Sequence, residues 1–400
     1  MQKQSLNSSL SGENNKKYEL ILDIGTSGIK AFVFDEEFNV ISKAHGEIQK
    51  YSPETCWVEQ DPKELLSVSI NVLRRAIEEC NLPESSFVGF GLVNQRETTI
   101  LWNKVTGEPV YPAIGWEDNR TDKECLNWQK QFGEIIRNKT GLNISPYFSA
   151  GKIWWVLQNI PLARQLLEKN NLVFGTVDTW ILWNIMEDKS RVTDYTNASR
   201  TLLFNIKTLE WDKELLDIFK ISSEILPQVK PSQDHFGMLR KDIVGFALPI
   251  LAVCGDQQAS LYAVGTDVGT TKITFGTGTF IMQIIGKEFK IYPDFFTTLT
   301  PCNNGAIYAV ESKINSTGEE TRELLKNPAG LKKYLTQIAG EVDTIINKLP
   351  IKPGELIIDG GITRDGLLAG ILSDISKIQV RQQKTFDGTA LGTAMLVKLS

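Results

Sequence analysis

The sequence predicts an α/β protein built from two lobes that face one cleft. At 400 residues and 44.8 kDa, the chain is long for a single core, because domains average about 150 residues. Two hairpins, each made of a strand, a glycine turn and a returning strand, lie far apart in the chain, with turns at residues 24–28 and 276–278. An approximate repeat of this kind indicates two related lobes.

The first lobe is expected to span residues 18–264, after a polar tail at residues 1–17 that we expect to be disordered. Its first helix has a well-marked start, since Asp61 can cap it, Pro62 suits the first helical position and Glu64 completes a capping box. The apolar face of this helix is expected to be Leu66, Ile70, Leu73, Ile77 and Cys80. The strands expected in this part of the lobe are residues 18–23, 29–34, 39–49 and 87–93.

The alternation of strands and glycine turns starts again towards the end of the first lobe, and the second lobe is expected to span residues 265–400. A third glycine turn follows an apolar strand at residues 356–358. The other elements expected here are strands at residues 248–253, 270–275 and 279–285, a helix at 257–264, a helix-like segment at 319–325 and a further segment at 331–349.

Charge and composition exclude several classes of partner. Lys and Arg number 43 and Asp and Glu number 48, so the net charge is −5 at pH 7. A protein that binds nucleic acid needs a basic excess, so we expect no nucleic-acid partner. No apolar stretch is long enough to span a bilayer, and the N-terminus lacks the pattern of a signal or transit peptide. We therefore expect a soluble cytoplasmic protein with no membrane partner.

The chain has few residues for metal or histidine chemistry. Its two histidines, His45 and His235, have no ligand-like spacing, so neither a zinc site nor a Ser-His-Asp triad is expected. The five cysteines include no Cys-x-x-Cys pair. An odd number of unpatterned cysteines is typical of a reducing compartment.

The first glycine turn carries a carboxylate and two hydroxyls. Asp23 ends a strand and is followed by Gly25, Thr26 and Ser27. Glycine lets backbone N–H groups approach an anion closely, and hydroxyls add donors to phosphate oxygens. A carboxylate there can hold Mg²⁺, directly or through water. A plain hairpin turn, in which Asp23 only satisfies backbone donors, explains these residues equally well.

Two further glycine turns also follow strands. Residues 276–278 (Gly-Thr-Gly) are similar to the first turn, and residues 359–361 (Asp-Gly-Gly) form the third. Each is a weak signal on its own, but three in one chain favour a cleft that clamps phosphates. The chain contains neither Gly-x-x-x-x-Gly-Lys-[Ser/Thr] nor Gly-x-Gly-x-x-Gly, which excludes a P-loop and a dinucleotide-binding turn.

The three turns resemble the two phosphate motifs and the adenosine motif of the actin and hexokinase superfamily of ATPases. Six further motifs resemble those of the FGGY carbohydrate kinases, in the form that glycerol kinases have. They are Asn-Gln-Arg-Glu-Thr-Thr (94–99), Trp116, Tyr-Phe-Ser-Ala-Gly-Lys (147–152), Gly-Thr-Val-Asp-Thr-Trp (175–180), Asp-Tyr-Thr-Asn-Ala-Ser-Arg (194–200) and Gly-Asp-Gln-Gln-Ala (255–259). The resemblance implies the actin-like ATPase (ribonuclease H-like) fold, with two lobes around a central cleft.

The same resemblance implies a pocket for glycerol. The residues that match this pocket are Arg96, Glu97, Trp116, Tyr147, Asp256, Gln257 and Phe280. Their chemistry agrees, because a triol needs oriented donors and acceptors for its hydroxyls and an apolar wall for its carbons. Taken singly, Arg96 and Glu97 also fit a surface charge pair, Trp116 and Phe280 fit core residues, and Asp256 fits a helix cap.

The resemblance further assigns the general base to Asp256 and the nucleotide to the glycine turns. A carboxylate can take the proton of the attacking hydroxyl while the protein positions the phosphoryl group. The residues implied for ATP are Asp23, Gly25, Thr26, Ser27, Lys30, Gly276, Thr277, Gly361 and Asp365, and Asp23 is also implied for Mg²⁺. An ordinary exposed strand lysine explains Lys30 equally well.

The implied function is ATP- and Mg²⁺-dependent phosphorylation of glycerol to glycerol 3-phosphate. A kinase for another polyol or ketose is one alternative, and a non-catalytic polyol-binding protein derived from such a kinase is another; a homodimer is left open. The second alternative follows from departures in the second lobe. The Pro-rich loop and second signature of the family are missing between residues 311 and 359, Asp365 stands where the family has Asn, and the chain ends soon after residues 391–395. The nucleotide lobe is therefore expected to be reduced.

Overall fold

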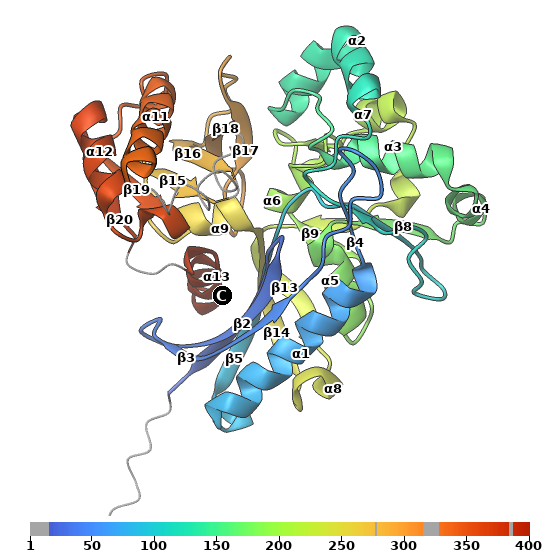
Figure 1. Ribbon diagram of the computed structural model, residues 1–400. Helices are drawn as coiled ribbons and strands as arrows, with labels where there is room; N and C mark the ends of the chain where they lie inside the picture. The colour runs from blue at the N-terminus through green and yellow to red at the C-terminus, as the bar shows by residue number, and fades with distance from the viewer. Residues whose placement is uncertain (1–15, 277, 315–327, 384–386) are drawn as a thin grey trace, which may run out of the picture.

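The computed structural model describes residues 16–276, 278–314, 328–383 and 387–400. Two six-stranded sheets form its framework, each with helices against it, and a largely helical region lies beside them (Figure 1). The mixed α/β architecture predicted from the sequence is confirmed.

The first sheet has the strand order β13-β14-β5-β1-β2-β3. Strands β1, β5 and β14 are parallel to one another, and the other three are antiparallel to their neighbours. Strand β1 is buried throughout, because Leu20 and Leu22 face the core beneath α1 while Ile21 faces the opposite layer. The strands are β1 (Tyr18–Ile24), β2 (Gly28–Asp35), β3 (Val40–Glu47), β5 (Phe87–Asn94), β13 (Gln233–Leu239) and β14 (Leu248–Gly255).

The second sheet repeats this topology. Its order is β17-β18-β16-β15-β19-β20, so β18-β16-β15-β19-β20 corresponds to β3-β2-β1-β5-β14 of the first sheet. In both sheets an antiparallel meander comes first and two parallel strands follow. The repeat expected from the two hairpins is thus confirmed. The strands are β15 (Thr271–Phe275), β16 (Thr279–Gly286), β17 (Phe296–Leu299), β18 (Tyr308–Ile314), β19 (Glu355–Asp359) and β20 (Gln379–Gln382).

Helix α1 (Pro62–Cys80) begins as predicted but is oriented differently from the expectation. Asp61 accepts the N–H of Lys63 at 2.8 Å and Pro62 occupies the first position. The predicted capping box is wrong, because the Glu64 carboxylate instead accepts the N–H of Gln49 at 3.1 Å. The buried residues are Pro62, Leu65, Ser69, Val72, Leu73 and Ala76. Four residues of the predicted face are only partly buried at its edge, namely Leu66, Ile70, Ile77 and Cys80.

A large insertion, residues 95–247, joins β5 to β14 and forms most of the helical region in Figure 1. Its own core packs Ile136, Phe148, Phe174 and Phe219 together. The helices are α2 (Asp122–Thr140), α3 (Ser149–Asn159), α4 (Pro161–Glu168), α5 (Val177–Ile185), α6 (Tyr195–Ala198), α7 (Lys213–Phe219) and α8 (Lys241–Val244). Short strand pairs are β4 (Glu59–Gln60) with β7 (Ala113–Ile114), β6 (Ile100–Asn103) with β8 (Leu172–Gly175), β9 (Val192–Asp194) with β12 (Gln228–Lys230), and β10 (Phe204–Asn205) with β11 (Glu210–Trp211).

Two helices link the sheets, and one of them corrects the expected division of the chain. Helix α9 (Asp256–Tyr262) lies between the two sheets (Figure 1). Its Ala259 packs on the first sheet and its Leu261 on the second. Helix α13 (Gly388–Lys398), expected in the second lobe, packs on the first sheet instead. A Cβ at Gly392 would lie 2.0 Å from the Ala259 carbonyl oxygen, so only glycine lets α13 cross α9 this closely. The boundary between residues 264 and 265 therefore does not hold for the last helix.

The remaining helices cover the second sheet. They are α11 (Pro328–Ile346) and α12 (Leu367–Ser376), and their core contains Leu335, Val342 and Leu368. Of the elements expected here, the segment at 331–349 is largely α11, and the helix-like segment at 319–325 lies outside the described residues. The predicted tail lies outside them up to residue 15.

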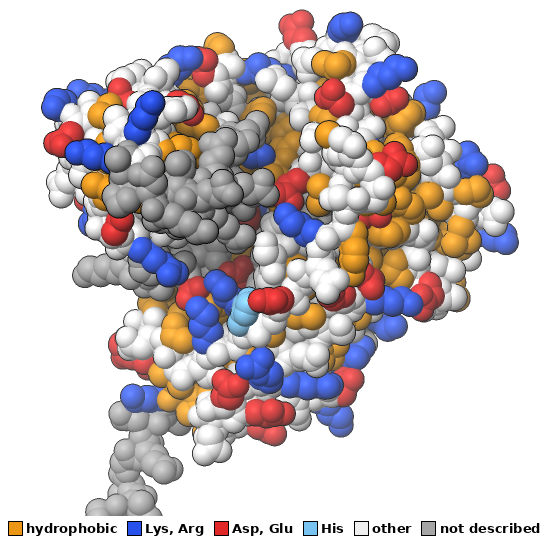
Figure 2. All heavy atoms as spheres, viewed as in Figure 1, with side chains coloured by type: hydrophobic (Ala, Val, Ile, Leu, Met, Phe, Trp, Pro, Cys, Tyr) orange, Lys and Arg blue, Asp and Glu red, His pale blue; other side chains and the backbone are white. Residues whose placement is uncertain are grey.

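The surface agrees with the near-balanced composition. Acidic and basic side chains are interspersed over the face seen in Figure 2. His45 and His235 are exposed, and all five cysteines are free, as the spacing predicted. Across the part of the chain that the structure describes, none of the helices has the length and apolar character needed to cross a membrane.

Candidate active site

Three parallel strands of the first sheet end at the same edge and bring distant residues together. In the sheet register, Ile24 of β1 and Gly255 of β14 both pair with Asn94 of β5. The residues that follow these strands, including Arg96 and Asp256, must therefore lie close to one another. In open α/β sheets, ligands bind beyond such carboxyl ends.

A cavity of about 120 Å³ opens at this edge, between the two lobes. Its lining residues are Thr26, Arg96, Glu97, Trp116, Tyr147, Asp256, Gln257, Thr274, Gly276, Gly278 and Phe280. Every residue predicted for the acceptor pocket is in this set. Thr26 and Gly276 come from the first and second glycine turns, so the structure places both turns beside the acceptor residues.

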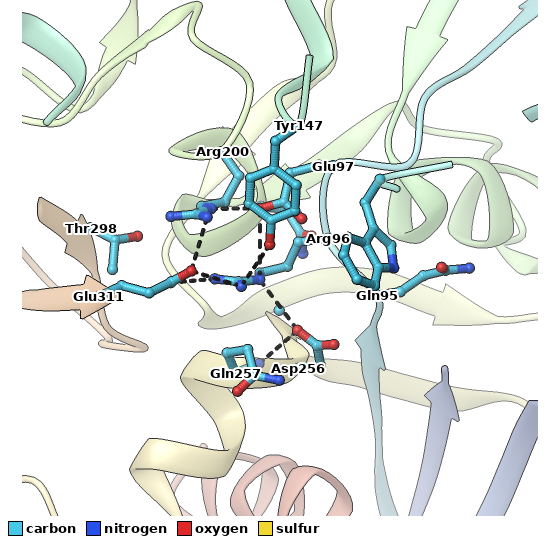
Figure 3. A network of polar contacts seen from close by, with 12 residues as sticks. Gln95, Arg96, Glu97, Tyr147, Arg200, Asp256, Gln257, Thr298 and Glu311 are labelled. Carbon is cyan, nitrogen blue, oxygen red and sulfur yellow. Dashed lines mark hydrogen bonds and ion pairs between the residues drawn. The ribbon is translucent and has the colours of Figure 1, made fainter. Parts of the chain in front are cut away.

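Two arginines and two glutamates form a buried network beside the cavity (Figure 3). Arg96 donates to both carboxylate oxygens of Glu311, at 2.7 and 3.1 Å. Arg200 donates to Glu97 at 2.6 Å and to Glu311 at 3.0 Å. Burial alone would raise the pKa of Glu311, but the charges of Arg200 and Arg96 hold it at about 2. The network therefore fixes the position of the Arg96 side chain.

The burial of the network excludes one alternative interpretation of Arg96 and Glu97. Arg96 is 2% exposed and Glu97 is 1% exposed, so a surface charge pair is excluded. The prediction missed Arg200 and Glu311. A signal existed for each, since Arg200 ends the Asp-Tyr-Thr-Asn-Ala-Ser-Arg motif and Glu311 is a charge within the buried half of β18.

Asp256 is the first residue of α9 and lines the cavity. Its Oδ1 accepts the N–H of Gln257 at 2.7 Å and lies 3.3 Å from Nε of Arg96. Burial raises the pKa of Asp256 to about 6, against the lowering effect of Arg96. Its side chain stays 27% exposed and so can reach a ligand. The cap position of α9 is Gly255 and no side chain caps the helix, so the alternative of Asp256 as a helix cap is wrong.

Aromatic side chains form the apolar wall of the cavity. The rings of Trp116 and Tyr147 meet edge to face at 5.8 Å, and Phe280 lies on the lining beside them. Trp116 donates through Nε1 to the Thr26 hydroxyl at 3.0 Å, which ties the wall to the first glycine turn. Buried Lys152 of α3 donates to the carbonyl oxygens of Tyr147 at 2.9 Å and Glu97 at 3.2 Å. This lysine, which the prediction did not single out, holds both backbones in place.

Residues 18–273 match the N-terminal domain of the FGGY family of carbohydrate kinases. The chain belongs to this family. Glycerol kinase 2 of Thermotoga maritima is 42% identical over 346 residues, which cover 86% of this chain and 69% of that protein. Glycerol kinase 2 of Sulfolobus acidocaldarius is 32% identical over an alignment of 450 positions, gaps included, that covers 96% of this chain and 89% of that protein.

Solved structures of FGGY kinases share the architecture described above. A crystal structure of Plasmodium falciparum glycerol kinase with ADP has a TM-score of 0.88 and 28% identity, covering 96% of this chain and 90% of that one. Gluconate kinase from Lactobacillus acidophilus has a TM-score of 0.83 at 18% identity and shares the fold alone. The actin-like ATPase fold is thereby confirmed, and the protein is a phosphotransferase that acts on an alcohol group.

The first glycine turn, predicted as a phosphate site, is a closed hairpin turn beside the last helix. The N–H of Gly25 bonds the Gly28 carbonyl at 3.0 Å, which closes the turn. Asp23 accepts a hydrogen bond from the Thr389 hydroxyl of α13 at 2.6 Å, and burial raises its pKa. Ser27 is exposed. The carboxylate is thus engaged by a side chain from the last helix of the chain.

Lys30 and the second glycine turn, both predicted for the nucleotide, have different surroundings. Lys30 forms an ion pair with Asp387 at 3.0 Å and is 38% exposed, so it is neither buried nor a freely solvated strand lysine. Asp387 also pairs with Lys43 at 2.6 Å. In the second turn, the N–H of Gly276 bonds the Gly278 carbonyl at 3.0 Å. Thr277 lies outside the described residues.

The third glycine turn lies apart from the cavity lining. A Cβ at Gly360 would overlap the Phe275 carbonyl at 2.0 Å, so the turn requires glycine, and its φ of 110° also favours glycine. Gly361 begins a short 3₁₀ turn, η3 (Gly361–Thr363). The Asp365 carboxylate accepts the N–H of Leu367 at 3.0 Å at the start of α12. Neither predicted nucleotide residue is part of the acceptor cavity.

Proposed function

We propose that this chain transfers the γ-phosphoryl group of ATP to a terminal hydroxyl of glycerol, with Mg²⁺ as the metal. The observation that carries the proposal is the cavity of about 120 Å³, in which two glycine turns, a carboxylate and an aromatic wall converge. The relatives at 42% and 32% identity, both named glycerol kinases, support the choice of glycerol. The volume of the cavity suits a small polyol.

The acceptor would be held by complementary polar groups. Arg96 donates hydrogen bonds to its hydroxyls, and Glu97 and Gln257 provide acceptors, while Trp116 and Phe280 cover its carbons. The carboxylates of Glu97 and Glu311 hold both arginines of the network rigid before the acceptor binds. Such pre-organisation places the reacting hydroxyl without a further ordering cost.

Asp256 acts as the general base in this proposal. A pKa of about 6 leaves the carboxylate ionised at neutral pH and still basic enough to accept a proton as the new bond forms. Arg96, 3.3 Å away, keeps the carboxylate in its ionised form. The proton of the acceptor hydroxyl goes to Asp256 while its oxygen attacks phosphorus.

The residues of the first two glycine turns fit a nucleotide phosphate with its metal. Thr26 and Gly276 lie on the cavity lining, where a hydroxyl and backbone N–H groups can face phosphate oxygens. Among the described residues no cluster of three or more His, Cys, Asp or Glu could hold a metal alone. One carboxylate, Asp23, fits Mg²⁺, which keeps several waters and binds phosphates. The ion would neutralise charge on the transferring group.

The other residues implied for ATP are assigned to the nucleotide from their positions alone. Gly25, Ser27 and Thr277 belong to the first two turns, Lys30 lies beside Asp387, and Gly361 and Asp365 lie near the third turn. We propose them as ATP contacts. A cytoplasmic location and a homodimer likewise stay predictions, and light scattering of the purified protein would test the second.

A coupled assay for glycerol 3-phosphate with purified protein, ATP and Mg²⁺ tests the proposed function. We expect turnover with glycerol and much less with four- to six-carbon polyols and ketoses. A higher kcat/KM for one of these would favour the alternative acceptor. Glycerol binding without turnover, together with no ATP binding by calorimetry, would favour the non-catalytic alternative, which the shortened second lobe motivates.

A further inference from the structure

Strand β18 carries two charged side chains towards the cleft, and the proposed function uses only the network around one of them. Met282 pairs with Glu311 and Phe280 pairs with Lys313 in the register of β16 and β18. Because side chains alternate along a strand, Glu311 and Lys313 lie on the same face. Glu311 bonds both arginines of the network. The same strand therefore places Lys313 on the acceptor side of the cleft.

The ammonium of Lys313 lies among the aromatic residues of the acceptor wall. Its Nζ is 4.5 Å from the ring centre of Trp116, 4.9 Å from that of Tyr147 and 5.8 Å from that of Phe280. All three rings line the cavity, which keeps about 120 Å³ with Lys313 in this position. Lys313 thus borders the cavity without filling it.

The stem of Lys313 is held beside the second glycine turn. Its Cε lies 3.3 Å from the place where a Cβ on Gly278 would be. A larger residue at 278 would press on this stem. The absence of a side chain at Gly278, which lines the cavity, leaves room for the lysine stem beside it.

The ammonium lacks a hydrogen-bond acceptor in the described part of the chain. Within residues 16–276, 278–314, 328–383 and 387–400, Nζ of Lys313 makes ring contacts but neither a hydrogen bond nor an ion pair. Burial lowers its pKa, while the charges of Glu97, Glu311 and Glu117 oppose that effect and Arg96 adds to it. Ring faces attract the charge but accept no ordinary hydrogen bond, so the N–H donors of this partly exposed side chain are available to a ligand oxygen.

We propose that Lys313 is an acceptor-contacting residue that donates a hydrogen bond to an oxygen of the bound polyol. This inference rests on the proposed function and extends it to a residue on the opposite lobe from Arg96. A polyol oxygen at the aromatic wall supplies the acceptor that the ammonium lacks. Glu97, Glu311 and Glu117 lie near enough to favour the charged form of Lys313, so a neutral hydroxyl suffices as the partner. Lys313 also limits the length of acceptor that the cavity admits.

Three variants separate the charge of this side chain from its bulk. Lys313→Met keeps a long unbranched stem and removes the donors, Lys313→Arg keeps the donors, and Lys348→Met is the matched control at an exposed lysine, 50% exposed and paired with Asp294. Loss of a charged hydrogen bond should raise the KM for glycerol by about 10- to 100-fold in Lys313→Met. The kcat should change by less than about threefold, because the contact exists before and during the reaction. Lys313→Arg should recover part of the loss.

Calorimetric titration of glycerol into nucleotide-free protein gives a readout that is independent of turnover. We expect Lys313→Met to bind glycerol more weakly than the wild type while its thermal midpoint stays close to that of Lys348→Met. Unchanged glycerol affinity in Lys313→Met, or a rise in the KM for ATP instead of glycerol, would overturn the inference and leave the proposed function standing. A wild type that neither binds nor phosphorylates glycerol would overturn the proposed function and this inference with it, so the two failures are distinguishable.

Lys313→Ala provides a second test that does not depend on charge. Shortening the side chain opens the aromatic side of the cavity, so the ratio of kcat/KM for four- and five-carbon polyols to that for glycerol should rise. An unchanged ratio would show that Lys313 does not limit acceptor length and would overturn that part of the inference.

Discussion

The two sheets share one strand order but differ in what is inserted between their last parallel strands. In the first sheet, β5 and β14 are joined by residues 95–247, whereas in the second β19 and β20 are joined by residues 360–378, which hold little besides α12. Both sheets place a glycine turn between their first two strands. Under the proposed function the two regions have different tasks. The repeated topology would provide the phosphate turns, and the insertion would provide Trp116, Tyr147 and Arg200 for the acceptor.

The second sheet also contributes residues to the acceptor side of the cleft. Phe280 on β16 and Glu311 on β18 reach across the cleft and meet residues of the insertion. Arg200 and Glu311 are 111 residues apart in sequence and bond directly. Closure of the two lobes would therefore complete the acceptor site as well as the phosphate site, because each site draws on both sheets.

The largest effect is expected at the carboxyl end of the first sheet, where the proposed base Asp256 lies. Asp256→Asn should lower kcat by about 10²- to 10⁴-fold, the usual contribution of a positioned base. Nucleotide affinity should change little, because the amide keeps the shape of the carboxylate. Steady-state kinetics with glycerol and calorimetry with ATP would measure both. Asp242→Asn, on exposed α8, is the matched control, and near-normal turnover of Asp256→Asn would remove this residue from the chemistry.

Glu311→Ala tests whether the second sheet holds the acceptor network together. Removing the carboxylate leaves Arg96 and Arg200 buried with one partner fewer, and breaking a buried ion pair costs about 3–5 kcal/mol of stability. The urea unfolding midpoint should fall clearly, and kcat/KM for glycerol should fall with it. Glu355→Ala removes a surface partner of Arg381 and should cost about 0–1 kcal/mol. Equal losses in the two variants would contradict the role of the network.

The pH dependence of kcat/KM for glycerol should report the ionisation of Asp256. Burial raises the pKa of this carboxyl to about 6, and only the ionised form accepts a proton. The rate should therefore be high above pH 6 and fall about tenfold for each unit below it. Asp256→Asn should lose this limb of the profile. A profile that stays flat down to pH 5 would show that a different group controls the reaction.

Much of the framework could be predicted because it is encoded locally. Apolar runs bounded by glycine turns predicted strands at 18–23 and 87–93, and the structure has β1 (Tyr18–Ile24) and β5 (Phe87–Asn94). The face of α1 was predicted less well, because a spacing of three and four fits neighbouring stripes on one helix. The buried stripe depends on which layer the helix meets.

Contacts between lobes could not be predicted from spacing. Helix α13 packs on the first sheet. A glycine at position 392 indicates a close backbone contact, but the sequence does not identify the partner. Lys313 reads as an ordinary strand lysine until the register of β16 and β18 places it over the aromatic wall. Asp365 was expected near adenine from its place in the motif, and the structure shows only its hydrogen bond at the start of α12. Sequence patterns describe each element, whereas the partner of an element is a property of the fold.

The smallest effect is expected on the nucleotide side, where the second sheet carries the short insertion. Phosphate contacts can come from Thr26 and Gly276 at the cavity. Of the two residues implied for ATP near the third turn, Gly361 has no side chain and the Asp365 carboxylate already accepts the N–H of Leu367. A site without hydrogen bonds to a base rejects a different base weakly. We therefore expect kcat/KM for ATP, GTP and CTP to lie within about tenfold of one another, the value of one neutral hydrogen bond.

Steady-state kinetics with saturating glycerol would measure these ratios, and Asp365→Asn is an informative variant. An amide at this position adds two N–H donors to a site that now presents a carboxylate. If residue 365 faces the base, the substitution should change the ratio of ATP to GTP and leave kcat nearly constant, because the chemistry takes place at the other end of the nucleotide. A strong preference for ATP in the unaltered protein would mean that the second lobe, in spite of its short insertion, builds a base pocket of its own. In that case the first lobe would select the acceptor, and the second lobe would select the base of the nucleotide.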